Sequence, residues 1–269
     1  MGTSTGERRI VTRRWQLRGI AAIALVMAVF AAPLSASHAA STPIFTDAFT
    51  DGGLNLLKWN YLLGEYPTNS QLYIPTEVSE DGTGLHLHGE QPSPFTINLA
   101  GGIESQQSFL YGEFHIIARM PKDDGLWPAA WLTAGKSGEI DIFEAFGSHT
   151  DRFQTTVHDW QNGVEGPPQC IQVGWTVPGS ICSTWRPRDK AGNPIDWHAD
   201  FHDWGMRWTP DGTSFTLDGK PYFQSTWSPS VPMQLVINLG MGTYWDGYPD
   251  TTDVWPASLD VRSVTVTAL

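Results

Sequence analysis

Short runs in which apolar and polar residues alternate recur along most of the chain. They combine β-branched or aromatic residues with Gly, Pro, Asn or Asp at their ends, as in residues 84–88, 112–119, 155–158, 214–217, 233–238 and 261–266. Alternation over four to eight residues is typical of a strand with one buried face. Helical periodicity is scarce, and no repeat of fixed period stands out, which argues against a propeller or β-helix. The pattern therefore predicts an all-β sandwich.

The segment with the sequence GEIDIFEAFG places three carboxylates on one predicted strand. Glu139 and Asp141 are two residues apart, so they point to the same face. Glu144 follows Asp141 by three, and it joins that face only if a β-bulge at Ile142 and Phe143 takes up one extra residue. Three acids on one face repel one another unless they differ in protonation, which suits a nucleophile, a proton donor and a helper. The alternative is a solvated strand face with ordinary surface charge.

Aromatic residues and a histidine lie close to this segment in the sequence. A strand at residues 129–132 leads through a loop at residues 135–138 into the acidic strand, so we expect the two to be antiparallel neighbours. Trp127 and Trp131 are four apart and both face the side of the acids if their strand is regular. His158 ends the next predicted strand and is either a site residue or a structural histidine.

The first forty residues differ in composition from the rest. Five arginines precede a thirteen-residue apolar run, residues 20–32, which is short for a membrane span, and small residues follow it. This order predicts a secretory signal peptide over residues 1–40 and a single domain over residues 41–269. The arginine pair around Arg13 also resembles a twin-arginine export signal, and an uncleaved anchor is the alternative. We expect a secreted, extracellular protein with no membrane association after cleavage.

The charge balance limits the partners. Five of the 16 basic residues and one of the 28 acidic residues lie in the first forty, so the remainder has a net charge near −16. Such a surface argues against nucleic acid and anionic membranes, whereas a neutral polymer is not repelled. Thirteen tryptophans are present. About half could serve packing, and the others suggest platforms on which sugar rings stack.

Cys170 and Cys182 are the two cysteines of the chain. They lie twelve apart in a Gly- and Pro-rich segment, so they could close one disulfide in an oxidising compartment, worth about 3 kcal/mol by loop-closure entropy. Metal binding is not expected there, because no nearby Cys or His completes a tetrahedral set. We expect residues 161–200 to form a long irregular insertion that the disulfide holds in place.

Six motifs in order resemble glycoside hydrolase family 16. They are residues 111–121, 125–132 (GLWPAAWL), 138–144 (GEIDIFE), 201–212, 217–220 and 238–242 (NLGMG). The resemblance extends from about Phe45 to the C-terminus. It implies a β-jelly roll of two curved antiparallel sheets, with the substrate in a cleft across the concave sheet. It also implies endo-acting hydrolysis with retention, through a glycosyl-enzyme intermediate.

The resemblance gives each acid of the strand a role. Glu139 matches the nucleophile and Glu144 the general acid/base. Asp141 lies between them, where it would hydrogen-bond the nucleophile and tune its charge. The physics agrees, because a retaining enzyme needs two carboxyl groups about 5–5.5 Å apart, one ionised and one protonated.

Other residues match family positions that contact substrate or metal. Trp127 and Trp131 match tryptophans of the sugar subsites next to the cleaved bond. His158 matches a histidine near the acid/base on the leaving-group side, and Trp245 resembles a loop aromatic that borders the cleft. Asp260 sits where some members ligate a structural calcium, and a plain surface aspartate is the alternative.

The resemblance implies a secreted endo-β-glycanase that cuts β-1,3- or mixed β-1,3/1,4-glucans. The bulged spacing disfavours the lichenase and xyloglucan branches of the family. An agarase- or carrageenase-like galactan hydrolase and a transglycosylase remain alternatives, and a non-enzymatic lectin is disfavoured because all three acids are present. Residues 159–200 are unlike the typical laminarinase, and Ala130 replaces the usual Phe, so the glycan stays open. We expect a monomer whose partner is a polysaccharide and which requires no cofactor, with the structural calcium at Asp260 left as one of the two alternatives.

Overall fold

The computed structural model describes residues 42–65, 71–92, 97–161, 163–175, 180–242, 247–250 and 252–269. Within these ranges the regular structure is strand, apart from one 3-10 turn, η1 (Pro75–Glu77). No helix there has the length and apolar character needed to cross a membrane. The predicted signal peptide over residues 1–40 and Trp245 lie outside the described residues, so both stay predictions.

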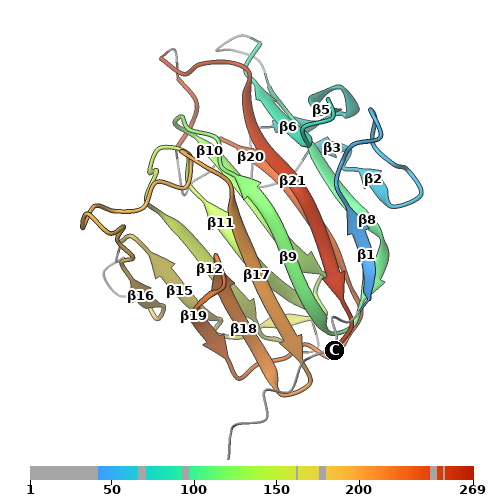
Figure 1. Ribbon diagram of the computed structural model, residues 1–269, viewed down its shortest axis with the longest axis vertical. Helices are drawn as coiled ribbons and strands as arrows, with labels where there is room; N and C mark the ends of the chain where they lie inside the picture. Colours follow the sequence, from blue (N-terminus) through green and yellow to red (C-terminus); the bar gives the residue numbers. More distant parts are fainter. Residues whose placement is uncertain are drawn as a thin grey trace, which may run out of the picture. The chain divides into compact units, whose positions relative to one another are not determined.

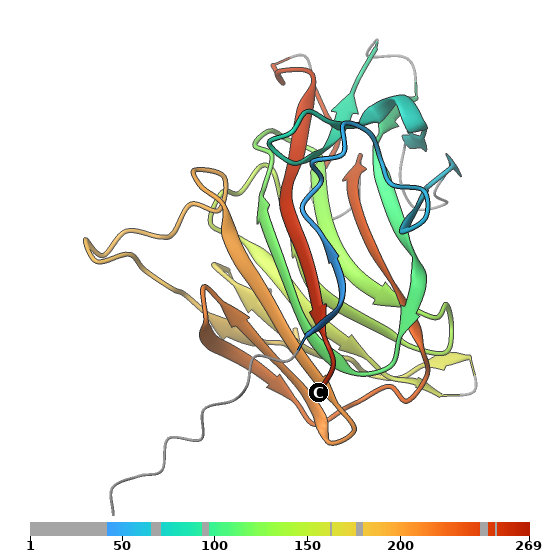
Figure 2. The same cartoon turned by 45° about the vertical axis from the view of Figure 1, so that its right-hand side comes forward.

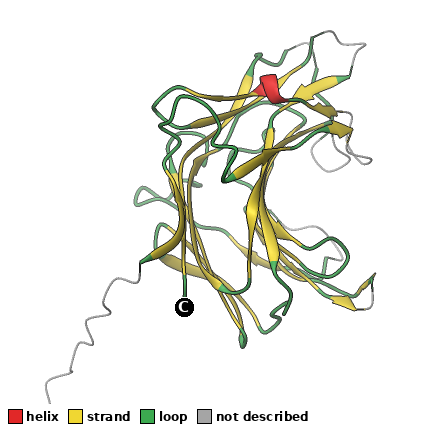
Figure 3. Cartoon of the chain, turned by 90° about the vertical axis from the view of Figure 1, so that its right-hand side faces the viewer, coloured by secondary structure: helices red, strands yellow, loops and turns green. Residues whose placement is uncertain are grey.

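Two sheets stack on each other, and Figure 3 shows them edge-on as two layers. The first sheet has 11 strands in the order β19-β18-β17-β9-β21-β6-β7-β4-β3, with β1 paired to β21 and β5 paired to β6. These strands are β1 (Pro43–Asp47), β3 (Gly64–Glu65), β4 (Gln71–Tyr73), β5 (Val78–Glu80), β6 (Leu85–Glu90), β7 (Asn98–Ala100), β9 (Gly112–Arg119), β17 (His202–Thr209), β18 (Gly212–Leu217), β19 (Lys220–Ser225) and β21 (Ala257–Thr267). In Figure 2 the blue β1 lies beside the red β21, so strands from opposite ends of the described chain are neighbours.

The second sheet has eight strands in the order β16-β15-β12-β11-β10-β20-β8-β2, and it lies behind β9, β17 and β21 in Figure 1. These strands are β2 (Trp59–Tyr61), β8 (Gly102–Phe109), β10 (Leu126–Thr133), β11 (Glu139–Ala145), β12 (Phe153–His158), β15 (Gln169–Val173), β16 (Ser183–Trp185) and β20 (Met233–Met241). A separate hairpin joins β13 (Trp160–Gln161) to β14 (Val164–Glu165). The predicted all-β sandwich is therefore confirmed.

One core of buried apolar side chains fills the space between the sheets. Burial alternates along β9, where Phe114 and Ile116 are fully buried between partly exposed neighbours. Phe153 of the second sheet packs edge to face on Trp204 of the first, with ring centroids 4.9 Å apart. The tryptophans that are at most 1% exposed are Trp59, Trp197, Trp204 and Trp208. Each removes about 150–250 Å² from water, so these four serve packing rather than sugar binding.

A β-bulge interrupts β11 at the position that the sequence predicts. On the β12 side, Asp141 lies opposite Thr156 and Glu144 lies opposite Gln154, so three steps along β11 match two steps along β12. Ile142 and Phe143 are 1% and 0% exposed and both belong to the core. Two consecutive side chains therefore point inward, and Glu144 returns to the face that holds the other two acids.

The segment 161–200 is more regular than we expect from its composition. β15 pairs with β12 and extends the second sheet, and β16 runs parallel to β15. Cys170 on β15 forms a disulfide with Cys182, which confirms the predicted pair. The expectation of an irregular insertion is wrong for this part of the segment, because β15, in which Cys170, Ile171 and Val173 are buried, pairs with β12 although turn-forming residues dominate the composition around it.

Candidate active site

Glu139, Asp141 and Glu144 line a cavity of about 370 Å³ over the second sheet. Gln154 on β12 and Gln172 on β15 line the same cavity, so it extends from β11 toward the β16 edge of the sheet. The three acids share one face, as the bulge requires. They are thus brought together around one space that a ligand can enter.

The same acids line a smaller cavity, of about 110 Å³, on the opposite side of β11. Trp131 on β10 and Tyr73 on β4 line this second cavity, and Trp127 borders both. Because β10 and β12 flank β11 in the sheet, the two cavities form one groove across the strands, with the acids in its middle. We call this groove the cleft. It suits a chain molecule that continues past the acids in both directions.

His158 joins the acids from β12. The strand register places it opposite Glu139, whereas Gln154 lies opposite Glu144. Its Nε2 is 2.8 Å from Oδ2 of Asp141 and 3.4 Å from Oε1 of Glu139. His158 lines the same cavity as Glu144, as the sequence leads us to expect, but its polar contacts on β11 are with Asp141 and Glu139, because β11 and β12 are antiparallel and the end of β12 meets the start of β11.

A fourth carboxylate, Glu165 on β14, contacts Nδ1 of His158. The imidazole therefore lies between two carboxylates and donates a hydrogen bond from each nitrogen, which only the cationic form can do. Burial lowers the pKa of His158, but the hydrogen bond to Asp141 and the nearby carboxylates outweigh burial and raise this pKa to about 10. Sequence reasoning missed Glu165. The available signal was an acid seven residues after His158, across a turn at Gly163.

Glu139 and Glu144 have different surroundings. Burial raises the pKa of Glu139 to about 7 and the charge of Asp141 adds to this, while the adjacent His158 cation opposes it. Burial raises the pKa of Glu144 well above its ordinary value, Asp141 again adds to the shift, and the His158 cation opposes it here too. Glu139 is the glutamate that lies within 3.4 Å of the cation. Glu139 is therefore the first of the two to ionise, and Glu144 keeps its proton.

A hydrogen-bonded chain orients Trp131 in the cleft. Its Nε1 donates to Oδ1 of Asn238 at 2.8 Å, and Nδ2 of Asn238 donates to the hydroxyl of Tyr73 at 2.9 Å. Tyr73 and Asn238 were not among the predicted site residues. Asn238 lies in one of the six family-like motifs, so its position was available as a signal, whereas Tyr73 reaches the cleft from a strand 165 residues earlier.

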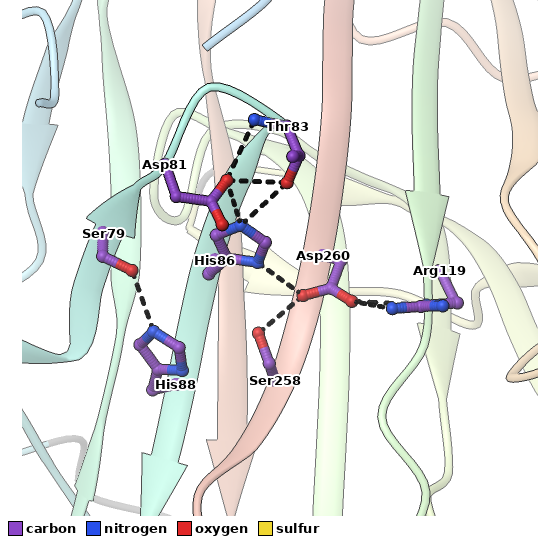
Figure 4. A network of polar contacts seen from close by, with 8 residues as sticks. All are labelled: Ser79, Asp81, Thr83, His86, His88, Arg119, Ser258 and Asp260. Carbon is purple, nitrogen blue, oxygen red and sulfur yellow. Dashed lines mark hydrogen bonds and ion pairs between the residues drawn. The ribbon is translucent and has the colours of Figure 1, made fainter. Parts of the chain in front are cut away.

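Asp260 lies on β21 in the first sheet, within the polar network drawn in Figure 4. Its Oδ2 accepts hydrogen bonds from Nη2 and Nε of Arg119 at 2.6 and 3.2 Å. Its Oδ1 lies 2.7 Å from Oγ of Ser258 and 2.8 Å from Nδ1 of His86. Burial favours the neutral acid, but these donors, Arg119 first, hold the pKa of Asp260 below its ordinary value. A guanidinium on the carboxylate repels a divalent cation, so this geometry does not fit a calcium ligand.

Glu139, Asp141 and His158 each offer one ligand atom within 4.8 Å of the others. Carboxylates and imidazole are ligand types that bind divalent metals. Here, however, Nε2 of His158 carries the proton that it donates to Asp141, and the imidazolium already balances the neighbouring negative charge. The three residues therefore fit a site that moves protons better than a metal centre.

A β-sandwich with a row of carboxylates in the middle of an open cleft has the arrangement of a polysaccharide hydrolase. The family model described as glycosyl hydrolases family 16 matches residues 69–257. A glucan endo-1,3-beta-glucosidase of Cryptopygus antarcticus is 28% identical over 206 residues, which cover 69% of this chain and 70% of that protein. A beta-glucanase of Rhodothermus marinus is 27% identical over 258 residues, with 83% and 84% covered.

Solved structures show the same fold. The laminarinase catalytic domain from Thermotoga maritima matches with a TM-score of 0.70 at 22% identity, over 85% of this chain and 98% of that one. The jelly roll expected from the sequence is confirmed by this match. With the family model covering most of the chain, the protein belongs to family 16 of the glycosyl hydrolases. It is a glycoside hydrolase.

Proposed function

We propose that this protein is an endo-acting glucanase that hydrolyses β-1,3-linked glucan with retention of configuration. The proposal rests on the row Glu139, Asp141 and Glu144, in which the two glutamates share a cleft but differ in surroundings. A retaining glycosidase needs this difference, because its nucleophile must be ionised while its acid is protonated.

In the first step, Glu144 gives its proton to the glycosidic oxygen while a carboxylate oxygen of Glu139 attacks the anomeric carbon. The bond between the anomeric carbon and the leaving oxygen breaks, and its electron pair goes to that oxygen. The imidazolium of His158, 3.4 Å from Glu139, favours the ionised nucleophile before the attack. Asp141 accepts the hydrogen bond of His158 and so holds the cation in place.

The second step releases the sugar. Ester formation removes the negative charge of Glu139, so Glu144 loses its proton more easily and now acts as a base. Glu144 takes a proton from a water molecule, whose oxygen attacks the anomeric carbon on the face that the leaving group had occupied. The ester bond breaks, its electron pair returns to Glu139, and Glu144 is again protonated.

The proposed substrate is a neutral glucan chain. The cleft passes the acids on both sides and carries Trp127 and Trp131, which offer faces for sugar rings. The relatives reported above are named as a glucan endo-1,3-beta-glucosidase and a beta-glucanase, which supports a glucan over a galactan. The predicted leader and the disulfide support secretion, since disulfides persist in oxidising compartments.

A reducing-sugar assay on laminarin, lichenan, agarose, carrageenan and xyloglucan tests the substrate. We expect the highest rate on laminarin. A highest rate on agarose or carrageenan would favour the galactan alternative, and products longer than the substrate would favour transglycosylation. Binding of glucan without any turnover would favour a lectin.

Azide rescue with an activated aryl β-glucoside tests the two roles. Alanine at position 139 or 144 should lower glucan hydrolysis by about 10²–10⁴-fold or more. In Glu144→Ala, azide attacks the glycosyl-enzyme and should give a β-glycosyl azide. In Glu139→Ala, azide attacks the substrate directly and should give the α-anomer. The opposite pair of anomers would exchange the two assignments, and full activity of either variant would refute that residue's role.

A further inference from the structure

A second opening, of about 500 Å³, meets the cleft at His158. It lies where the loop between β10 and β11 and the loop between β19 and β20 come together with the end of β12. Its lining includes Ser137, His158, Asp159, Trp160, Trp227 and Ser230, and we call it the side pocket. The proposed reaction uses His158 but no other residue of this lining.

The lining has the chemistry of a neutral sugar site. Trp160 and Trp227 are partly buried aromatic side chains, and Ser137 and Ser230 expose hydroxyl groups. Aromatic surface with a few polar groups is the usual composition of a small-molecule site, and the volume lies in the usual range of roughly 300–1,000 Å³. Among the described residues that line it, no lysine or arginine is present to bind a sulfate, phosphate or uronate.

The position of the side pocket relative to the acids indicates which sugar it would take. The cleft runs across the strands, from β15 on one side of β11 to β4 on the other. The side pocket instead lies along the strand direction, beyond Gly138 and Glu139 at the start of β11. A glucan main chain follows the cleft, so a substituent that leaves the main chain sideways at the sugar above Glu139 points to this pocket.

We infer that the side pocket binds a single neutral glycosyl side chain carried by the main-chain sugar next to the cleaved bond. The inference rests on the proposed glucan hydrolysis and specifies its substrate class as a branched rather than a strictly linear glucan. His158 lines both spaces, so the side chain passes this residue on its way from the cleft.

Two oligosaccharides test the inference. One is a linear β-1,3-gluco-oligosaccharide, and the other is the same molecule with one 6-O-glucosyl substituent. The wild-type enzyme should cleave beside the substituted sugar, and mass spectrometry of the products should find the side chain on the terminal sugar of one fragment. Wild-type cleavage of the linear substrate checks the proposed function separately. If neither substrate is cleaved while another glycan is, the proposed function fails and this inference fails with it.

Variants then separate the side pocket from the cleft. Ser230→Trp places a large side chain at an exposed position of the lining, and Trp227→Leu removes an aromatic face while keeping apolar packing. Each should lower kcat/KM on the branched substrate by about tenfold, the value of one or two lost polar or stacking contacts. The linear substrate should change by less than about twofold, which also reports correct folding.

The matched control is Ser79→Trp, since Ser79 is an exposed serine on β5 of the first sheet and lines neither space. It should leave both substrates unchanged. The inference is overturned if the wild-type enzyme does not cleave beside the substituted sugar. It is also overturned if both side-pocket variants change kcat/KM equally on the two substrates. It is also overturned if neither variant affects either substrate.

Discussion

Nε2 of His158 lies 2.8 Å from Oδ2 of Asp141, so a cation is held beside the row of acids in the cleft. Glu165 contacts the opposite nitrogen of the same ring. A negative, a positive and a negative group therefore follow one another from Asp141 through His158 to Glu165. Glu165 lies on the β13–β14 hairpin, which is separate from both main sheets.

Glu165→Gln keeps the size of this outer side chain and removes its charge. We expect the pKa of His158 to fall below about 10, because the contact with the Glu165 carboxylate is lost, and to stay above its ordinary value, because the larger effects of Asp141 and Glu139 remain. Above the new pKa the ring is neutral and no longer balances the charge of the row, so the basic side of the kcat/KM profile should move to lower pH. NMR titration of the His158 ring and a pH profile on laminarin measure the two effects.

The control for this change is Glu113→Gln, which removes an acid 3.7 Å from His115 on the first sheet. It should leave the titration of His158 and the pH profile of the enzyme as they are. Glu165→Asp should restore part of the wild-type profile, because it returns the charge. An unchanged titration of His158 in Glu165→Gln would show that Glu165 does not stabilise the cation.

Glu144→Gln should make the protein more stable at neutral pH while it lowers activity. The pKa of Glu144 is raised in the folded state, so that state holds more protons than the unfolded state above pH about 4.5. Stability is then lost as the pH rises, and glutamine removes this loss. We expect the gain in the free energy of unfolding to be larger at pH 7 than at pH 4. Urea unfolding at several pH values measures it. A gain that does not grow with pH would contradict the raised pKa.

The raised pKa of His158 adds stability, and this stability also falls as the pH rises, but in a different pH window. Its pKa is raised from 6.5 to about 10, so the stability it adds is complete below pH 6.5 and is lost as the pH rises through about 10. In His158→Gln, the free energy of unfolding should therefore depend less on pH between these values than in the wild-type protein. Equal slopes in the two proteins would contradict an ion-paired imidazolium.

Asn238→Ala should weaken both the cleft and the fold. It removes the acceptor of the hydrogen bond from Nε1 of Trp131, and an unsatisfied buried polar group costs about 1–3 kcal/mol. We expect a lower midpoint of urea unfolding and a raised KM for laminarin. Asn60→Ala, which removes a more exposed contact with Gln106, is the control and should change stability by about 0.5 kcal/mol or less. A KM as in the wild-type enzyme would show that the orientation of Trp131 is fixed by packing alone.

Replacing Cys170 and Cys182 together by serine should lower the free energy of unfolding by about 3 kcal/mol, the loop-closure value for a link across twelve residues. Because Gln172 on the same strand lines the cleft, the KM for glucan should rise as well. Urea unfolding with and without reductant measures the first effect. Reductant should destabilise the wild-type protein and have no effect on the double variant. Equal midpoints for the two oxidised proteins would contradict a stabilising role of the disulfide.

The residues of the site that sequence predicts are those whose geometry is local. The spacing of Glu139, Asp141 and Glu144 gives the bulge, because strand alternation is a short-range property. The same alternation places Trp127 and Trp131 beside the acids. The predicted β-sandwich rests on short-range alternation too, repeated in many short strands.

The contacts that sequence misses join residues far apart or depend on which strand pairs with which. Tyr73 reaches Asn238 from a different sheet, and the partners of Asp260 become visible only once β21 lies between β6 and β9. The side of the row on which His158 lies follows from the register of β11 and β12. Glu165 lies near His158 in sequence, but its role depends on a hairpin inside a segment that composition marks as irregular.

Deletion of a single residue, either Ile142 or Phe143, would convert β11 into a strand without a bulge. Removal of one of them leaves the acids at positions two apart throughout, so ordinary strand alternation would still keep all three on one face. The bulged and unbulged strands are therefore separated by a single codon, with no catalytic group lost at either end of the step. What the extra residue changes is the register beyond Asp141, and with it which side chain of β10 and of β12 stands beside Glu144.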